Sequence, residues 1–352
     1  MGVENVVNEY QCVLAVLGSD CTMLKVDYEA IVIETGDDGA VYAVAFHSHG
    51  LHLLSGHGNG IRRWRVADGQ EVGNRVEMDV NAISVSRDGK WIVCGTSPGA
   101  SVWDAKMQEK AIEVEDTEYV GAVDISPEST RFATAAGGSS NYEARIWNII
   151  TGERLVGPLQ HDGLIRGLKF SPNGEHIATV VNDAYIRVFD SHNGDQLITI
   201  KTDIPGWSPV TPLAWSHDGQ RFFAPASDRK IKSFDMSTGS QLAELQVHGD
   251  RTVAVSIAPA ANGKFLATFA GHSISFCDTS TLTLIGPVIE DSQNIRSIAL
   301  SPDCSYLATG GFNGDITIRH LNGILPDLYG PFRVSTYTLT VLSEESYIVF
   351  PS

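Results

Sequence analysis

The stretch IRGLKFSPNGEHIATV, residues 165–180, decides the fold of this chain. It consists of two short apolar runs rich in β-branched residues, and a polar segment that contains Asn173 and Gly174 separates them. Two such runs around a turn of this kind predict a β-hairpin. The same pattern recurs at residues 41–56, 80–95, 120–135, 210–225, 253–268 and 295–310.

Each hairpin is followed by a third apolar run, and most of these runs end in an aromatic residue next to a small polar one. A turn and a fourth run then follow, as in LVGPLQ at 155–160 and LIGPVI at 284–289. Four strands in roughly 40 to 46 residues is the period of a propeller blade. Helical periodicity is absent. The sequence therefore predicts an all-β protein in which residues 1–352 form a single domain.

The ends of the third runs carry a family resemblance. Trp103-Asp104 is a literal WD pair. Near copies of it are Trp147-Asn148, Phe189-Asp190 and Phe234-Asp235. On these pairs the chain resembles the WD-repeat β-propeller family over essentially its whole length. Residues 151–179 also show a weak likeness to the propeller repeats of fungal NACHT-type signalling proteins.

The resemblance implies a buried hydrogen-bond network that links histidine, serine or threonine, aspartate and tryptophan within a blade. His161, Thr179 and Asp183 are the candidates for three of its members in one repeat. Phe189 stands where the tryptophan belongs. We therefore expect the propeller without the complete network.

The two ends of the chain determine the expected number of blades. Residues 337–350 align with the inner hairpin at 295–308, and residues 16–34 align with a third strand followed by an outer one. Residues 328–334 match the fourth runs, so the seventh repeat already has an outer strand. These alignments favour eight four-stranded blades over the alternative of seven. The N- and C-terminal strands would share one blade, which closes the ring and removes an open sheet edge.

Charge and cysteine content restrict the function classes. The formal net charge of −17 argues against nucleic acid and against an anionic membrane, because both attract basic surfaces. The five cysteines are scattered without a C-x-x-C spacing, so neither a disulfide framework nor a zinc ribbon is expected. The N-terminus lacks the basic and apolar parts of a secretory signal. We expect a cytoplasmic protein, with the nucleus as the alternative.

The connections between fourth and first strands are rich in acidic residues, and aromatic residues are interleaved with them. In a propeller these loops gather with the second-to-third loops at one end of the channel, where their potentials add. Aromatic side chains of this kind anchor interfaces. Solvated loops of an acidic protein are the alternative interpretation. The candidate contact residues are Asp37, Asp38, Tyr42, His57, Asn59, Glu115, Asp116, Glu118, Tyr119, Tyr142, Asp162, Arg166, Trp207, Asp250, Asp291, Arg296 and Phe312.

Four histidines, at positions 47, 49, 52 and 57, lie within eleven residues. His47 and His49 fall at a first-to-second turn, whereas His57 falls beyond the second strand. A five-residue strand spans about 16 Å, and zinc binds its nitrogen ligands at about 2 Å. The four histidines therefore cannot share a metal, and the His47/His49 pair lacks a third ligand. No metal or cofactor is expected.

Catalytic motifs are also missing. The glycine-rich stretches connect strands and none opens a helix, so they lack the context of a phosphate-binding loop. No G-x-S-x-G elbow occurs. Asp124 and Lys169 occupy equivalent inner-strand positions of neighbouring repeats, which favours a structural ion pair.

The sequence therefore predicts a non-enzymatic, monomeric scaffold that presents an acidic, aromatic-containing loop face to protein or peptide partners. The partners are expected to be basic, because opposite charges attract across an interface. A carbohydrate-binding propeller lectin is the alternative, and it would need a similar pocket in each blade. A hydrolase with a metal at the channel mouth ranks below both.

Overall fold

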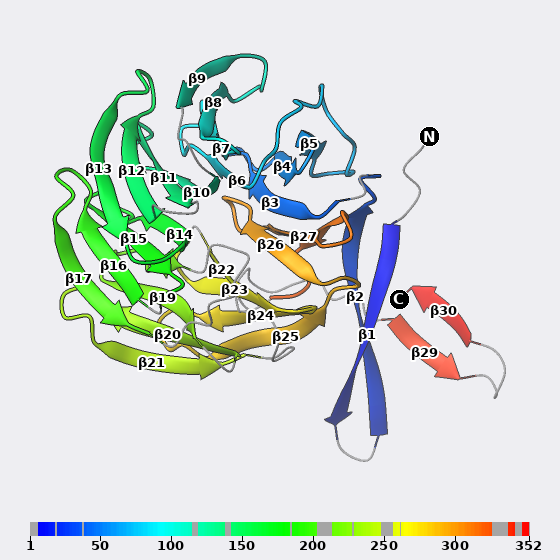
Figure 1. Ribbon diagram of the computed structural model, residues 1–352. Coiled ribbons are helices and arrows are strands. Elements are labelled where there is room, and N and C mark those ends of the chain that lie inside the picture. The colour runs from blue at the N-terminus through cyan, green and yellow to red at the C-terminus, as the bar shows by residue number, and fades with distance from the viewer. Residues whose placement is uncertain are drawn as a thin grey trace.

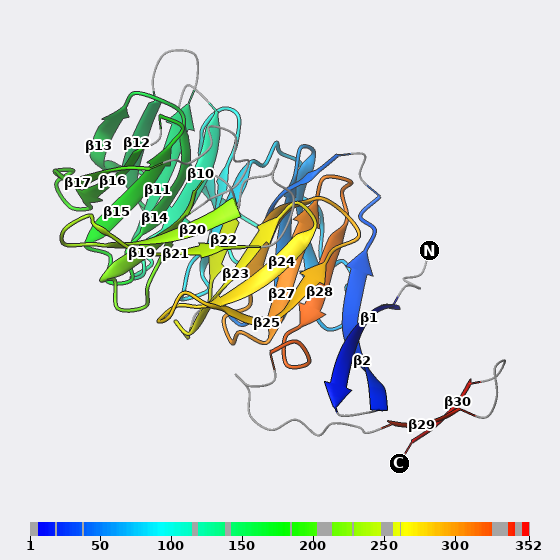
Figure 2. The same ribbon diagram turned by 90° about the horizontal axis from the view of Figure 1, so that it is seen from below.

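A computed structural model shows a ring of small sheets around a central channel (Figure 1). It describes residues 6–17, 20–36, 39–114, 119–137, 142–183, 185–202, 213–226, 229–247, 256–260, 262–325, 337–341 and 347–351. The ordered elements are strands, numbered β1 to β30, and this confirms the all-β prediction. The perpendicular view shows the sheets side by side along the ring, with the N-terminal hairpin projecting from the edge of one sheet and the C-terminal hairpin outside the ring (Figure 2).

A buried serine explains why the hairpin turns recur. In the stretch at 165–180, the Ser171 hydroxyl accepts a hydrogen bond from the His176 amide at 2.9 Å. Gly174 closes this turn with a φ of +78°, a conformation in which a side chain would be strained. The same serine-to-amide bond, between 2.9 and 3.1 Å, is made by Ser86, Ser126, Ser216 and Ser301.

Five blades consist of four consecutive antiparallel strands each. The second is β6 (Ala82–Val85), β7 (Trp91–Gly95), β8 (Ala100–Asp104) and β9 (Lys110–Val114). The third is β10 (Val120–Ile125), β11 (Arg131–Gly137), β12 (Tyr142–Asn148) and β13 (Arg154–His161). The fourth is β14 (Ile165–Phe170), β15 (His176–Val181), β16 (Tyr185–Asp190) and β17 (Gln196–Lys201). The fifth is β18 (Ala214–Trp215), β19 (Arg221–Ala226), β20 (Lys230–Asp235) and β21 (Gln241–Gln246), and the sixth is β22 (Ser256–Pro259), β23 (Phe265–Ala270), β24 (Ser273–Asp278) and β25 (Leu284–Glu290).

The first and the last blade differ from these five. The first blade has β3 (Val41–Phe46), β4 (His52–His57) and β5 (Gly60–Arg65), and isolated bridges at Ile61–Val76 and Trp64–Glu71 stand in for a fourth strand. The last blade has β26 (Ile295–Leu300), β27 (Tyr306–Gly311) and β28 (Ile316–His320). Its fourth strand is β2 (Asp20–Ile33), which pairs with β28, and β1 (Val6–Leu17) lies outside β2.

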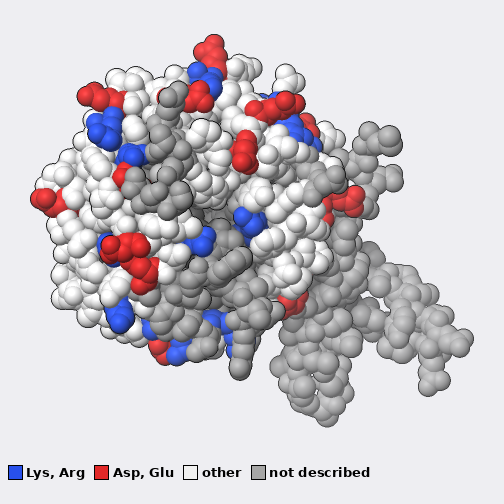
Figure 3. Space-filling model, in the orientation of Figure 1, with Lys and Arg blue, Asp and Glu red and all other residues white. Residues whose placement is uncertain are grey.

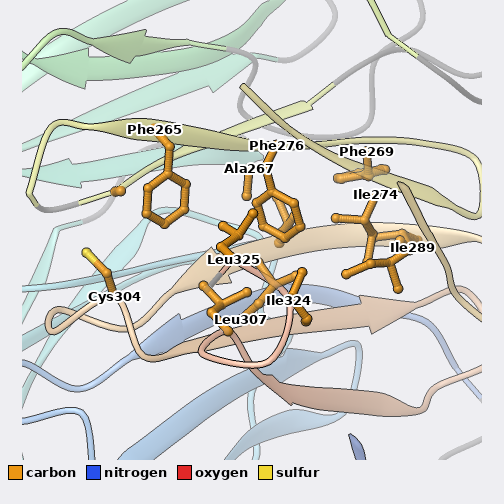
Figure 4. Packing of buried hydrophobic residues seen from close by; sticks show 14 residues of the cluster. Phe265, Ala267, Phe269, Ile274, Phe276, Ile289, Cys304, Leu307, Ile324 and Leu325 are labelled. Atoms are coloured by element: carbon orange, nitrogen blue, oxygen red, sulfur yellow. The ribbon is translucent and has the colours of Figure 1, made fainter. Parts of the chain in front are cut away.

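Among the described residues, the core consists of seven apolar clusters, and each of them joins two neighbouring blades. Figure 4 shows the cluster between the sixth and last blades, where Phe265 and Phe276 pack toward Leu307, Ile324 and Leu325. The cluster that closes the ring contains Val41, Leu53 and Trp64 of the first blade together with Ala308, Ile316 and Ile318 of the last.

The expectation of eight blades is therefore wrong, and the ring has the seven blades given as the alternative. The first and last blades are in direct contact, which leaves no place for another. Residues 30–33, assigned from the sequence to an eighth blade, complete the seventh instead. The hairpin of β29 (Tyr337–Val341) and β30 (Tyr347–Pro351) forms a two-stranded sheet of its own. Residues 328–334, taken as the outer strand of the seventh repeat, lie outside the described residues. The blade that residues 16–34 and 337–350 were expected to share is therefore not formed, because β2 pairs with β28 while β29 and β30 pair with each other in a separate sheet.

Candidate functional site

A β-bulge lies at the beginning of four inner strands, on the face that carries the fourth-to-first loops. The pairing with the second strand shifts register around Tyr42, Gly121, Arg166 and Arg296. Bulges of this kind redirect a side chain and are over-represented next to functional sites. The inner strands surround the channel (Figure 1), so these positions lie at its mouth. Asn81 stands at the equivalent position of the second blade, directly before β6.

Arg296 lies at the centre of the side chains gathered there. Its guanidinium carbon is 4.3 Å from the ring centre of Tyr42 in the first blade and 5.2 Å from that of Phe312. Phe312, in the second-to-third loop of the last blade, leaves 46% of its surface exposed. Burial lowers the pKa of Arg296, but an arginine remains charged at neutral pH.

Tyr119, which precedes β10, completes the group from the third blade. A Cβ atom at Gly121 would lie 2.6 Å from Cε1 of Tyr119, so the glycine makes room for the ring. Burial raises the pKa of the Tyr119 hydroxyl, while the charges of Arg296 and Arg166 lower it. Tyr119 is therefore within electrostatic reach of both arginines, although 43% of its surface is exposed. We call Tyr42, Tyr119, Arg166, Arg296 and Phe312 the channel-mouth cluster.

The channel-mouth cluster is a recognition surface in chemical terms. Its guanidinium groups donate hydrogen bonds to acidic or carbonyl oxygens, and its exposed rings provide apolar contact area. In the view of Figure 3, some basic side chains lie near the middle of the ring, and others lie toward its edge among the acidic side chains. The candidate residues that the sequence placed on this face thus include five that the structure brings together.

Three further candidates lie on the same face but farther from the channel. Tyr142 begins the third strand of its blade and is half-buried. Asn59 is exposed in the turn between β4 and β5, where its carbonyl oxygen accepts a bond from Arg75 Nε at 3.1 Å. The carboxylate of Asp162 is 91% exposed and lies 3.4 Å from Arg187.

Two candidates are buried, and their assignment to an exposed contact face is wrong. His57 is 1% exposed and exchanges a 2.9 Å hydrogen bond with the Ser55 hydroxyl. Asp291 forms a 2.9 Å ion pair with Arg319, and both side chains are fully enclosed. Both residues were expected to be exposed because the sequence places them in loops on the channel-mouth face. Each side chain instead turns inward to a polar partner.

The remaining candidates lie outside the described residues. They are Asp37, Asp38, Glu115, Asp116, Glu118, Trp207 and Asp250.

The WD-type hydrogen bonds survive in parts. The indole nitrogens of Trp64 and Trp147 donate to Ser55 at 2.7 Å and Thr134 at 3.0 Å. In the fourth blade, His161 and Thr179 are joined at 2.9 Å as expected. Phe189 meets the His161 ring edge-on instead of supplying a donor. Asp183 binds Arg187 at 2.7 Å, and it is this ion pair that occupies its carboxylate.

The rings of His47 and His49 stack, and His52 meets the His49 ring edge-on, at the opposite end of β4 from His57. Their centres are 4.0 Å apart for the first pair and 5.1 Å for the second. Burial, followed by the neighbouring histidines, lowers the pKa of His47 to about 4. Among the described residues, no three His, Cys, Asp or Glu side chains are arranged to hold a metal ion.

The opposite face of the channel carries two adjoining cavities of about 280 and 730 Å³. Both are lined by Arg87, Pro172 and His217 from the first-to-second turns. Asp124 and Lys169, 2.5 Å apart, line the smaller one. Asp124 also accepts a bond from the Phe170 amide at 2.9 Å, so the predicted structural role of this pair is confirmed.

The structure describes the side chains of three cysteines, Cys94, Cys277 and Cys304, and all three are buried and unbridged. Burial raises the pKa of Cys94 and Cys277 to about 12, which keeps both thiols protonated and unreactive. Within the described ranges, no helix is long and apolar enough to span a membrane.

Three residues of the channel mouth were not predicted from the sequence. They are Asn81, Gly121 and Asp79. The charge of Asp79 raises the pKa of Tyr119. A search for charged loops misses Asn81 and Gly121, whereas an alignment of the equivalent positions at the start of the inner strands would have found both. A single glycine or asparagine in a loop does not indicate a binding site. Only its equivalence to the mouth positions of the other blades does.

Comparison with known proteins gives matches along several parts of the chain. The model described as WD domain, G-beta repeat matches residues 30–65 and 278–319, and the anaphase-promoting complex subunit 4 WD40 domain model matches residues 141–207. Eukaryotic translation initiation factor 3 subunit I of Emericella nidulans is 25% identical over 67% of this chain and 72% of that protein. Serine-threonine kinase receptor-associated protein of Gallus gallus is 24% identical over 53% of this chain and 50% of that protein.

Proposed function

Because this chain is a member of the WD-repeat β-propeller family, we propose that it is a non-enzymatic scaffold that binds protein or peptide partners at the channel mouth. The observation that carries the proposal is the channel-mouth cluster. Tyr119 and Phe312 keep nearly half of their surface exposed beside two arginines. Tyrosine and arginine are enriched among the residues that dominate binding energy at interfaces.

The relatives favour a protein partner. Their names describe one as a subunit of a translation initiation factor and the other as a receptor-associated protein. Both names imply a role within an assembly. We propose the same for this chain, as a monomeric propeller in the cytoplasm that binds neither nucleic acid nor membrane.

The acidic loop residues form the proposed rim of this surface and select a basic partner. Asp162 is the described example, with its carboxylate almost fully in solvent. Asp37, Asp38, Glu115, Asp116 and Glu118 are proposed to act with it, because charges gathered at one end of a channel add their potentials. Asp291 has no part in this rim, since its charge is paired inside the last blade.

The carbohydrate-binding alternative is less well supported. A lectin of this architecture needs a similar pocket in each blade. The equivalent mouth positions carry Tyr42, Asn81, Gly121, Arg166 and Arg296, which differ in size, charge and hydrogen-bonding capacity. One asymmetric surface suits one asymmetric partner.

The test is quantitative affinity capture with three baits. They are the wild-type chain, the double variant Tyr119→Ala/Phe312→Ala and the matched control Leu197→Ala/Leu242→Ala, which removes exposed apolar side chains from outer strands. We expect the mouth variant to lose the partners that the control retains. Equal recovery by all three baits would show that partners bind elsewhere. Neutral amides at positions 37, 38, 115, 116 and 118 should weaken capture more at low salt than at high salt, because salt screens exposed charges.

A further inference from the structure

Arg296 has no anionic partner among the residues that the structure describes. Its guanidinium contacts the rings of Tyr42 and Phe312, but within the described part of the chain it makes neither a hydrogen bond nor an ion pair. Its Nε atom is buried and has no acceptor within the described ranges. Removing a charged donor from water without a partner is costly, and such groups are ordinarily paired. A cation left in this state at a binding surface is therefore prepared for a ligand that supplies the acceptor.

A second donor at the mouth is in the same condition. Asn81 Nδ2 is buried and, among the described residues, has no hydrogen-bond acceptor. Asn81 and Arg296 occupy equivalent positions in the second and last blades, and Tyr42 of the first blade lies between them in the ring. Arg296 Nε and Asn81 Nδ2 are both hydrogen-bond donors, so a ligand that pairs with them must supply hydrogen-bond acceptors.

We propose that the partner segment inserts one acidic side chain, an Asp or Glu, into the channel mouth, where Arg296 pairs with its carboxylate and Asn81 contributes a second donor. This inference rests on the proposed scaffold function and names the group that the scaffold recognises. Tyr42 and Phe312 hold the guanidinium in place, which reduces the entropy lost when the pair forms. Hydrogen bonds between charged groups are about twice as strong as neutral ones.

The acidic rim gives this central pair a role in specificity. With a formal net charge of −17, the protein repels an acidic segment as a whole. A segment with basic residues at its flanks and a single carboxylate at its centre satisfies both the rim and the mouth. A uniformly basic segment would leave Arg296 unpaired and place a like charge beside it. Discrimination against that alternative needs such a repulsive element.

The experiment is selection of a displayed random dodecapeptide library on the immobilised full chain. The wild-type protein should enrich peptides in which one Asp or Glu lies between Lys or Arg residues. On Arg296→Gln the acidic residue should no longer be enriched, while the basic flanks persist. Arg65→Gln, which removes an exposed arginine paired with Asp68 near a third-to-fourth turn, should behave as wild type.

Synthetic peptides then give the magnitude. The best peptide should bind the wild-type chain about tenfold more tightly than its analogue with Gln or Asn at the acidic position. On Arg296→Gln the ratio should fall to about twofold or less, and Arg296→Lys should give an intermediate ratio because the charge stays but the planar fork is lost. Thermal unfolding at the wild-type temperature verifies that each variant is folded.

The outcomes separate the two proposals. Enrichment of basic peptides without the acidic residue overturns the inference and leaves the scaffold proposal standing. Enrichment that is the same on Tyr119→Ala/Phe312→Ala as on wild type overturns the proposed site itself. If acidic residues are enriched only when Glu115, Asp116 and Glu118 are replaced by amides, the chain's own loop occupies the mouth, and the inference is again wrong.

Discussion

Arg319 pairs with Asp291 across 2.9 Å in the interior of the last blade, and the Thr309 hydroxyl donates to the same carboxylate oxygen at 2.9 Å. Asp291 stands four residues before β26, as His161 stands four residues before β14. Thr309 and Arg319 likewise match Thr179 and Phe189 of the fourth blade. An ion pair has therefore replaced the histidine-centred hydrogen bonds of a WD blade at the seam of the ring.

Loss of one partner from this pair should destabilise the protein strongly. Asp291→Asn removes the carboxylate charge that lies 2.9 Å from the enclosed Arg319 guanidinium, and we expect a loss of about 3–5 kcal/mol in the free energy of unfolding. Urea denaturation measures it. The control Asp68→Asn breaks the exposed Arg65–Asp68 pair and should change stability by no more than about 1 kcal/mol. Equal effects of the two substitutions would mean that the buried pair has no special weight.

His161 should make stability depend on pH. Burial lowers its pKa from 6.5 to about 4, so between these values the unfolded chain binds more protons than the folded one. Its contribution is present in full above pH 6.5 and is lost as the pH falls toward 4, by up to about 3 kcal/mol. Urea titrations at pH 7.5 and pH 4.5 should show a smaller difference for His161→Gln than for wild type. His47 contributes in the same direction, so some dependence remains in the variant.

The seven-blade ring predicts different outcomes for deletions at the two ends. Removing residues 1–34 takes away β2 and exposes the edge of β28, and an open edge invites aggregation. Removing residues 337–352 leaves every described blade complete. Size-exclusion chromatography and thermal unfolding should find the first variant aggregated or strongly destabilised and the second close to wild type. The reverse ranking would favour a ring that is closed by the C-terminal hairpin.

Gly121→Ala should affect binding without affecting the fold. The added methyl group would lie 2.6 Å from the Tyr119 ring, and this ring can move because it is partly in solvent. We expect the free energy of unfolding to change by less than about 1 kcal/mol, whereas recovery of partners in the capture assay falls. A binding profile identical to wild type would show that the position of Tyr119 is unimportant.

The repeat pattern predicted the strand order because each hairpin is encoded locally, by alternating apolar residues and by the serine turn. The blade count depended on which sheet the N-terminal strand joins. Sequence similarity of residues 337–350 to an inner hairpin predicts a strand pair, and that pair exists, but its location depends on long-range packing. Val41 and Trp64 belong to one buried cluster with Ile316 and Ile318, and this packing has no local signature.

The candidate site was predictable for the same reason and to the same extent. Strand starts and loops can be assigned to a face from topology alone, which placed Tyr42, Tyr119 and Arg296 together. The direction in which a side chain points cannot be assigned from topology. For this reason Asp291 was assigned to the surface, although it pairs with Arg319 in the interior of the blade. The positive charge at the centre of the mouth was not predicted either. Arg166 and Arg296 are two basic residues among many acidic ones in the sequence, and the β-bulges of the folded chain bring them to the same mouth.

Photo-crosslinking from the mouth tests the central claim most directly. The photoreactive p-benzoylphenylalanine replaces Phe312 in one sample and Leu242, an equally exposed residue of the outer strand β21, in another. We predict that irradiation in a cell extract yields discrete protein adducts at position 312, that Arg296→Gln diminishes them, and that position 242 yields few. Adducts of equal yield and identity at both positions, or adducts at 312 that Arg296→Gln leaves unchanged, would contradict partner binding at the channel mouth.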